Sequence, residues 1–392
     1  MNQSEKYFVA LISSYLNQST PPLPNEVDWQ EIYRLACIHN VCAIVADRIM
    51  ALSEVTGIDS ELMSQFRQQL GYTLIDSSEK EEAQHFIKEL LESSNTDHIF
   101  IKGAVLKNYY PVPELRTSSD TDVIIRHTDM EKVRSIITKK ATDISDNNSN
   151  VITALYNNQH IEIHSERDSD HPYFDGIFDM CEKDGNKYII SDELHLIYVL
   201  CHMIKHFKMC GAGIKMFMDI DVLLRRLGSF DYKSFIDKCS QLNIDVFASA
   251  CFSLCRKWFD TPICKDADLS ADKKVIALFE EEILSSGNFG FNVRDLGNYY
   301  INKGTKSNHK NSFITKIRAM AALFFPKKEY LMRQYKYARK YPFLLPIAWA
   351  NRIAAAVFKR SEHSKNTIKS IFTSGKDSQQ YINLLCELDI RD

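Results

Sequence analysis

The stretch from His98 to Arg126 constrains the fold of this chain most strongly. Its order is a short strand, a glycine turn, a helix start, a proline-containing loop and a second strand that opens with Asp120-Thr121-Asp122. Side chains alternate between the two faces of a strand, so Asp120 and Asp122 point the same way. Neighbouring carboxylates repel each other unless a cation or a basic group lies between them. A divalent cation such as Mg²⁺ binds carboxylate oxygens and keeps positions for phosphate and water, so the pair favours a metal site.

A third acid follows in the segment His160-Ile161-Glu162-Ile163-His164, which alternates strictly between polar and apolar residues. This alternation predicts a strand with His160, Glu162 and His164 on one face. If the strand lies beside the first one, Asp120, Asp122 and Glu162 converge on one edge of a sheet. That arrangement suits two metal ions roughly 3.5–4 Å apart, which clamp the attacking and leaving oxygens of a phosphoryl displacement.

These motifs resemble those of the DNA polymerase β-like nucleotidyltransferase superfamily, and in particular those of a bacterial uncharacterised nucleotidyltransferase family within it. The resemblance covers roughly residues 20 to 360. The positions that carry it are Lys102-Gly103, Arg116, Ser119-Asp120-Thr121-Asp122, Glu162-Ile163-His164, His202, Lys205-His206 and Asp219.

The resemblance implies a metal-dependent enzyme that transfers a nucleoside monophosphate from a nucleoside triphosphate, such as ATP, to an unidentified acceptor hydroxyl. Two Mg²⁺ or Mn²⁺ ions would be held by Asp120, Asp122 and Glu162, which are also the expected catalytic residues. Lys102, the N–H groups after Gly103 and Arg116 would steer the triphosphate. Further nucleotide or substrate contacts are expected from Ser119, His164, His202, His206 and Asp219.

Two other classes of function stay open. The wider superfamily has Gly-Ser after its first strand, whereas this chain has Gly103-Ala104. Loss of the serine hydroxyl favours a catalytically inactive module that binds a nucleotide or a partner. The alternative is a metal-dependent phosphohydrolase centred on His202, His206, Asp219 and Asp221, although the chain contains no His-Asp dipeptide, which that fold would use.

The predicted fold class is α+β, with a small mixed sheet flanked by helical regions. Residues 1–95 form an N-terminal helical region, 96–190 the α/β core, 191–300 a helical substrate or cap domain, and 301–392 a basic, aromatic-rich helical region. Apolar periodicity predicts helices at residues 7–16, 27–39, 41–52, 60–91, 127–139, 191–207, 232–242, 246–258 and 271–284.

Four local features refine this prediction. The long helix 60–91 contains Gly71, where we expect a break. Residues 143–150 are polar and predict a turn. Residues 151–156 and 159–165 then predict a hairpin around Asn157-Asn158. Residues 188–190 form either a last strand or the lead into the next helix.

Charge is distributed unevenly along the chain. Residues 303–369 contain sixteen Lys or Arg residues and two acids, whereas the whole chain has a net charge of −3. A basic segment of this kind suggests a polyanion or an anionic membrane surface as partner. The apolar run 342–358 is too short and too interrupted for a transmembrane segment. The ten cysteines lack metal-site spacing, and the N-terminus does not resemble a signal peptide, so we expect reduced thiols in a cytoplasmic protein.

Overall fold

The computed structural model describes residues 1–24, 26–52, 57–148, 150–228, 231–262, 272–287, 341–358 and 376–390. The chain forms two compact units. The first consists of Met1–Lys205 and Gly213–Gly287, and the second of His206–Ala212 and Asn288–Asp392. The acidic motif and the other predicted site residues lie in the first unit, except for His206.

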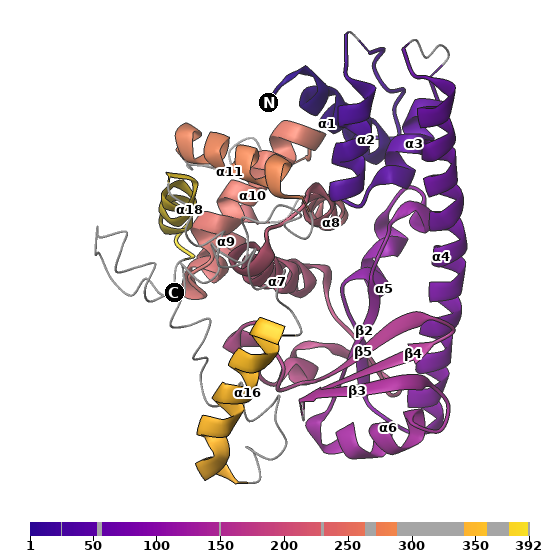
Figure 1. The fold of residues 1–392 in the computed structure, drawn as a ribbon, viewed down its shortest axis with the longest axis vertical. Helices are drawn as coiled ribbons and strands as arrows, with labels where there is room; N and C mark the ends of the chain where they lie inside the picture. The colour runs from indigo at the N-terminus through magenta and orange to yellow at the C-terminus, as the bar shows by residue number, and fades with distance from the viewer. Residues whose placement is uncertain are drawn as a thin grey trace. The chain divides into compact units, whose positions relative to one another are not determined.

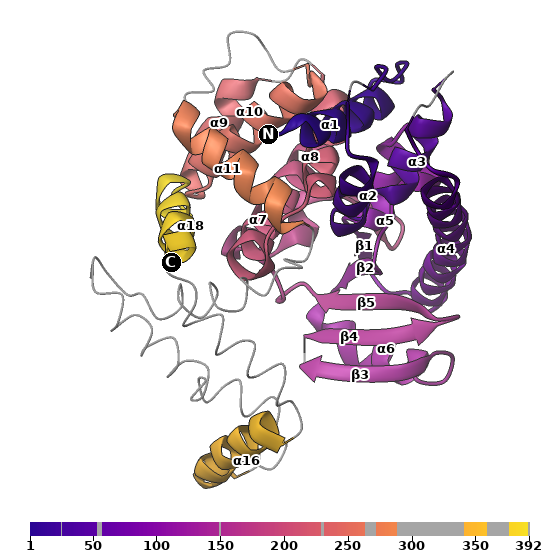
Figure 2. The ribbon, with the colours of Figure 1, turned by 45° about the horizontal axis from the view of Figure 1, so that its top comes forward.

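The first unit contains a mixed seven-stranded sheet with the order β3-β4-β5-β2-β1-β7-β6. Its strands are β1 His98–Phe100, β2 Asp120–Ile125, β3 Thr142–Asn148, β4 Val151–Tyr156, β5 Gln159–Ser165, β6 Glu182–Asp184 and β7 Lys187–Ile189. Strands β1 to β5 are labelled in Figure 2. The central strand β2 pairs antiparallel with β1 and parallel with β5, while β1 is parallel to β7. The remaining neighbours are antiparallel. This sheet, with helices on both sides, confirms the predicted α+β class.

One face of the sheet is covered by α4 (Ser60–Ser93) and α6 (Met130–Ile137) (Figure 1). The strand residues that pack against these helices include Val123, Ile161 and Ile163, all of which are fully buried. Because side chains alternate along a strand, their neighbours in β2 and β5 point to the opposite face. Burial of one apolar face therefore fixes the direction of the acidic residues.

Three helices precede α4: α1 Gln3–Leu16, α2 Trp29–Ile38 and α3 Cys42–Met50. Side chains cap several of the N-termini, as Asn2 does for α1, Asp28 for α2 and Asp59 for α4. The expected break at Gly71 is wrong, because α4 continues through this residue. The helix tolerates Gly71, because packing of the helix against the sheet stabilises it by more than one glycine of low helix propensity destabilises it.

After the sheet comes α7 (Asp192–Cys210), which starts in the first unit, and then four more helices of that unit. These are α8 Ile214–Leu227, α9 Tyr232–Gln241, α10 Asp245–Phe259 and α11 Lys273–Ser286. Ser191 caps the N-terminus of α7, since the Leu194 N–H donates to Ser191 Oγ at 3.3 Å. The four later helices pack around buried rings such as Phe217, Phe247 and Phe279.

The turn expected at residues 143–150 is wrong for residues 143–148, which lie in a strand, while Asn150 does lie in a turn. This strand, β3, pairs antiparallel with β4 with two irregularities in register. A strand at the edge of a sheet needs no apolar alternation when its neighbour supplies backbone hydrogen bonds. Tyr188 and Ile189 belong to strand β7. Of the two expectations for residues 188–190, a last strand is therefore confirmed.

The described part of the second unit contains η6 (Pro342–Leu344), α16 (Leu345–Phe358) and α18 (Lys376–Glu387). Tyr381 in α18 packs against Phe207, with ring centroids 5.7 Å apart. Most of the basic segment 303–369, on which the polyanion or membrane partner was predicted, lies outside the described residues. No helix in the described part of the chain has the length and apolarity to cross a bilayer.

Candidate active site

The acidic residues of β2 and β5 lie side by side because the two strands pair in parallel. In this register Asp122 is opposite Glu162 and Asp120 is opposite His160. Asp120, Asp122, Glu162 and His164 all project from the face that the apolar core does not use. The acids were expected to converge if these two strands are neighbours in the sheet, and the strands are neighbours.

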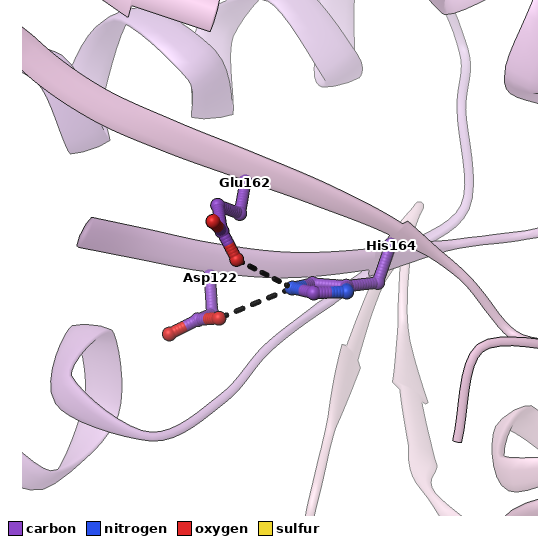
Figure 3. Close-up of side chains that lie close together, drawn as sticks. All are labelled: Asp122, Glu162 and His164. Atoms are coloured by element: carbon purple, nitrogen blue, oxygen red, sulfur yellow. Dashed lines mark hydrogen bonds and ion pairs between the residues drawn. The ribbon is translucent and has the colours of Figure 1, made fainter. Parts of the chain in front are cut away.

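Three of these side chains form a compact cluster (Figure 3). His164 Nε2 lies 3.2 Å from Asp122 Oδ1 and 3.4 Å from Glu162 Oε2. One ligand atom from each of the three residues lies within 4.8 Å of the others, a geometry that could hold a metal ion. His164 Nδ1 also contacts Asp168 Oδ2 at 3.0 Å. Asp120 is outside this cluster, and its Oδ1 accepts a hydrogen bond from Ser119 Oγ at 3.0 Å.

Electrostatics in the cluster favour charged groups of both signs. Burial opposes charge on His164, but the surrounding carboxylates raise its pKa to about 11, so both ring nitrogens donate. Burial also opposes ionisation of Asp122, yet Lys102 and His164 hold its pKa well below the usual range. The hydrogen bond from His164 lowers the pKa of Glu162. Burial and the Asp122 charge raise the pKa of Asp120.

Lys102 occupies a strained turn between β1 and the short helix α5 (Gly103–Leu106). Its φ is 50°, a value that side-chain-bearing residues seldom adopt. The Lys102 N–H donates to Nε2 of the buried His195 at 3.0 Å, and burial lowers the pKa of this histidine to about 4. Lys102 Nζ then reaches Asp122 Oδ1 at 2.8 Å. The strained backbone thus directs an ammonium group at the acidic face.

Arg116 is buried and bound in a fork by Asp219. Its Nε and Nη2 atoms each lie 2.8 Å from one carboxylate oxygen, and the Tyr110 hydroxyl donates to the same carboxylate at 2.6 Å. Only the Nη1 end of the guanidinium remains, with a long contact of 3.4 Å to the Thr117 carbonyl. A Cβ placed on Gly103 would lie 2.7 Å from this Nη1. The glycine therefore makes room for the arginine.

His202 lies on α7 and is paired with Asp170, with 2.7 Å between Nδ1 and Oδ2. Lys205 Nζ contacts the other Asp170 oxygen at 2.6 Å. One turn further, His206 belongs to the second compact unit. Since His202 and Asp219 are bound by different partners, the structure does not bring together the set that a phosphohydrolase centre would need. Among the described residues, the cluster suited to a metal is that of β2 and β5.

Comparison with known proteins agrees with this geometry. Residues 25–260 match the family described as uncharacterised nucleotidyltransferase. The chain belongs to this family. No curated protein and no solved structure matches the chain. The matched residues include the acidic strands, the Lys102 turn and the Arg116–Asp219 pair.

Several residues around the site were missed from the sequence. Asp168 and Asp170 follow β5 in an irregular segment, where no periodicity marks them. His195 could have been found, because it precedes His202 by seven positions and so shares a helix face with it. Lys215 lies four residues before Asp219 on α8 and could have been found in the same way. Lys80 lies in α4, and no pattern in the sequence connects this helix with the acids.

Proposed function

We propose that the chain is a Mg²⁺-dependent nucleotidyltransferase. It transfers a nucleoside monophosphate from a nucleoside triphosphate to an acceptor hydroxyl and releases pyrophosphate. The observation that carries this proposal is the parallel pairing of β2 with β5, which aligns Asp122 with Glu162 and leaves Asp120 on the same face. Membership of the family supports the reaction class.

The donor atoms fit a hard divalent cation. Carboxylate oxygens are the ligands that Mg²⁺ prefers, and Asp122 and Glu162 supply them within reach of each other. Asp120 adds a third carboxylate from the same strand face. When bound, Mg²⁺ or Mn²⁺ would neutralise charge on the phosphate oxygens, and two ions would suit the three acids.

The chain's own residues then position the reactants. The acceptor oxygen attacks the α-phosphorus, the bond to the β-phosphate oxygen breaks, and pyrophosphate leaves. The proton of the acceptor hydroxyl passes to Glu162, whose side chain is 34% exposed, whereas that of Asp122 is 3% exposed. Lys102 and His164 hold the Asp122 carboxylate in place from two sides. Catalysis of this kind depends mainly on positioning and charge neutralisation.

The other predicted contacts are retained as parts of this proposal. Lys102, Gly103, Arg116 and Ser119 border the position of the nucleotide. On the acceptor side we place His164 and His202, and His206 stays a predicted substrate contact. Because Asp219 holds Arg116 in a fork, its role is to fix the arginine rather than to reach the substrate itself.

The test measures pyrophosphate release from each nucleoside triphosphate with Mg²⁺ or Mn²⁺, with a cell extract as the source of acceptor. We expect release by the wild type and a loss of at least about a hundredfold in Asp122→Asn, because electrostatic stabilisation of this kind contributes several kcal/mol. The matched control is Asp184→Asn, an exposed acid on β6 of the same sheet, which keeps activity. Metal-dependent nucleotide binding without release would instead identify a binding module. Equal release by wild type and Asp122→Asn would overturn the proposal.

A further inference from the structure

The thiols of Cys37 and Cys42 meet where α2 ends and α3 begins. Cys37 lies in the last turn of α2, and Cys42 is the first residue of α3. Their Sγ atoms are 3.2 Å apart, in direct contact. Since both thiols are free, small changes in the two side-chain torsions bring the sulfur atoms to bonding distance. The fold therefore holds two reduced thiols together at a turn between helices.

The surroundings give these two thiols different reactivity. Cys37 is exposed, whereas Cys42 is buried. The hydrogen bond from Cys42, together with a second one from the Tyr33 hydroxyl, lowers the pKa of Cys37 to about 7, although packing around its sulfur opposes this change. The contact with Cys37 and burial hold the pKa of Cys42 well above its ordinary value. Because the thiolate is the nucleophile, Cys37 reacts first and Cys42 keeps its proton.

The other described cysteines of the first unit have less reactive surroundings. Cys181 has intermediate exposure, and burial raises its pKa to about 11. Oxidation of cysteine follows thiolate character and exposure, so Cys181 is the slower thiol on both counts. The remaining ones are buried, namely Cys201, Cys239, Cys251 and Cys255. Selective reaction at Cys37 therefore follows from its surroundings.

The turn between the two cysteines supports the loop in front of the acidic strand. The Thr117 hydroxyl donates to the Asn40 carbonyl at 2.7 Å, and Thr117 lies shortly before β2 in the chain. A covalent bond between Cys37 and Cys42 closes a small ring around this turn. Such a bond restricts the motion of the backbone on which the loop rests.

We propose that Cys37 and Cys42 form a redox site, which hydrogen peroxide or another peroxide converts reversibly into a disulfide. The disulfide holds the turn between α2 and α3 against the loop that precedes β2. This inference is independent of the proposed function, because neither thiol belongs to the acidic cluster and the reaction needs no nucleotide.

The peroxide is the oxidant in this reaction, and the two electrons that it accepts come from the two thiols. The Cys37 thiolate attacks one peroxide oxygen, so an S–O bond forms, the O–O bond breaks and hydroxide leaves. The product is a sulfenic acid on Cys37. The Cys42 sulfur then attacks the Cys37 sulfur, the S–S bond forms, the S–O bond breaks, and the released hydroxide takes the Cys42 proton to form water. A reducing thiol such as dithiothreitol restores both cysteines by exchange.

The first experiment treats the full chain with limiting hydrogen peroxide, alkylates the remaining thiols and digests the protein with trypsin for mass spectrometry. Cleavage after Arg34 and Arg48 gives a fragment that contains both thiols and no other cysteine. We expect this fragment to lose two hydrogen atoms and to resist alkylation, at a rate at least about tenfold above the oxidation of Cys181. Dithiothreitol added before alkylation restores both thiols. Oxidation of the pair no faster than that of Cys181, or a sulfenic acid that persists on Cys37 of the wild type, would overturn the inference.

Variants assign the roles of the two thiols. In Cys42→Ala the sulfenic acid has no thiol beside it, so we expect it to accumulate on Cys37, where dimedone traps it. In Cys37→Ala we expect Cys42 to stay reduced, because it is buried and keeps its proton. The matched control is Cys181→Ala, which forms the disulfide at the wild-type rate. Rapid oxidation of Cys42 in Cys37→Ala would contradict the inference, and the wild-type experiment does not depend on the folding of any variant.

Hydrogen exchange of the wild type tests the effect of the disulfide on the turn. The Asn40 N–H donates to the Cys37 carbonyl at 3.1 Å, and the Val41 N–H donates to the Ala36 carbonyl at 2.9 Å. Such amides exchange when the turn opens locally, and a cross-link around the turn opposes this opening. We expect exchange at Asn40 and Val41 to slow at least about threefold on oxidation, with no change in the edge strand β3. Equal exchange in the reduced and oxidised proteins would reject the disulfide as a constraint on the turn.

Discussion

At the scale of single residues, the site is organised by a buried ion pair. Arg116 and Asp219 are separated by about a hundred positions in sequence, yet they form two parallel hydrogen bonds and both are buried. Removal of one member would leave a buried charge without a partner, which costs about 3–5 kcal/mol. The two residues were both selected from the sequence, but their pairing was not predicted, because no local pattern connects a loop with a later helix.

Gly103 offers a test of how tightly this pair is packed. A Cβ at this position would lie 2.7 Å from Arg116 Nη1 and 3.2 Å from Ser118 Cβ, and the fork with Asp219 prevents the guanidinium from moving away. We expect Gly103→Ala to lower the free energy of unfolding by about 1–3 kcal/mol, as for other overpacked sites. Urea denaturation measures this change.

The matched control for that substitution is Gly71→Ala in α4, where nothing lies within 4 Å of the added methyl group. Alanine has the higher helix propensity, so this variant gains stability, by about 1 kcal/mol. A pair of variants with opposite signs separates steric contact from any general effect of adding a methyl group. If Gly103→Ala also stabilised the protein, the packing around Arg116 would not be as tight as described.

At the scale of secondary-structure elements, the β4–β5 hairpin determines which residue of β5 faces Asp122. The hairpin was predicted with its correct turn, since Asn157 and Asn158 both have positive φ values, of 48° and 63°. Asparagine tolerates this conformation better than most residues, which is why the sequence signal was strong. A slip of one residue would turn Glu162 to the core face.

Asn158 therefore controls the stability of this hairpin. An L-residue without a short polar side chain costs about 1–2 kcal/mol in the left-handed region, so we expect Asn158→Ala to lower the free energy of unfolding by about 1 kcal/mol. Asn158→Gly is the control and leaves stability unchanged or slightly higher, because glycine adopts positive φ without strain. Both values come from urea denaturation. Equal stability of the alanine and glycine variants would mean that the turn conformation is not a constraint.

The elements that the sequence did not predict share a physical cause. Strand β3 has a polar sequence and was expected to be a turn, because its stability comes from backbone pairing with β4 and not from an apolar face. In α4 the expected break at Gly71 does not occur, since contacts with the sheet outweigh one unfavourable residue. Elements with clear apolar periodicity, such as α10 and β5, were predicted almost to the residue.

At the scale of the whole molecule, the sequence predicted the acidic face but not what surrounds it. The alternation in β2 and β5 is local, so the direction of Asp120, Asp122 and Glu162 followed from pattern alone. The approach of α4, α7 and α8 depends on contacts between segments far apart in sequence, and these contacts supply Lys80, His195 and Lys215. Side chains that join distant helices are therefore the part of the fold that only the structure reveals.

His39 is one of the side chains that connect distant helices of the first unit, and its protonation makes the free energy of unfolding depend on pH. It is fully buried at the end of α2, accepts a hydrogen bond from the Ile214 N–H at 3.2 Å and contacts the Leu284 carbonyl at 3.3 Å. The two contacts require a neutral ring with its proton on Nε2, because Nδ1 must accept. Burial lowers the pKa of His39 to about 4, whereas an unfolded histidine titrates near 6.5.

The sign of the pH effect follows from these two pKa values. Above about pH 6.5 the ring is neutral in both states, so His39 contributes no pH dependence. As the pH falls toward 4, the unfolded state binds a proton that the folded state excludes, and stability declines. Between pH 7 and pH 5 we expect the wild type to lose about 2 kcal/mol more than His39→Gln, which keeps a donor for Leu284 but cannot be protonated. Urea denaturation at the two pH values measures this difference. Because both proteins contain His195, its contribution cancels when the two losses are compared. Equal losses in the two proteins would show that His39 is not held neutral between α2, α8 and α11.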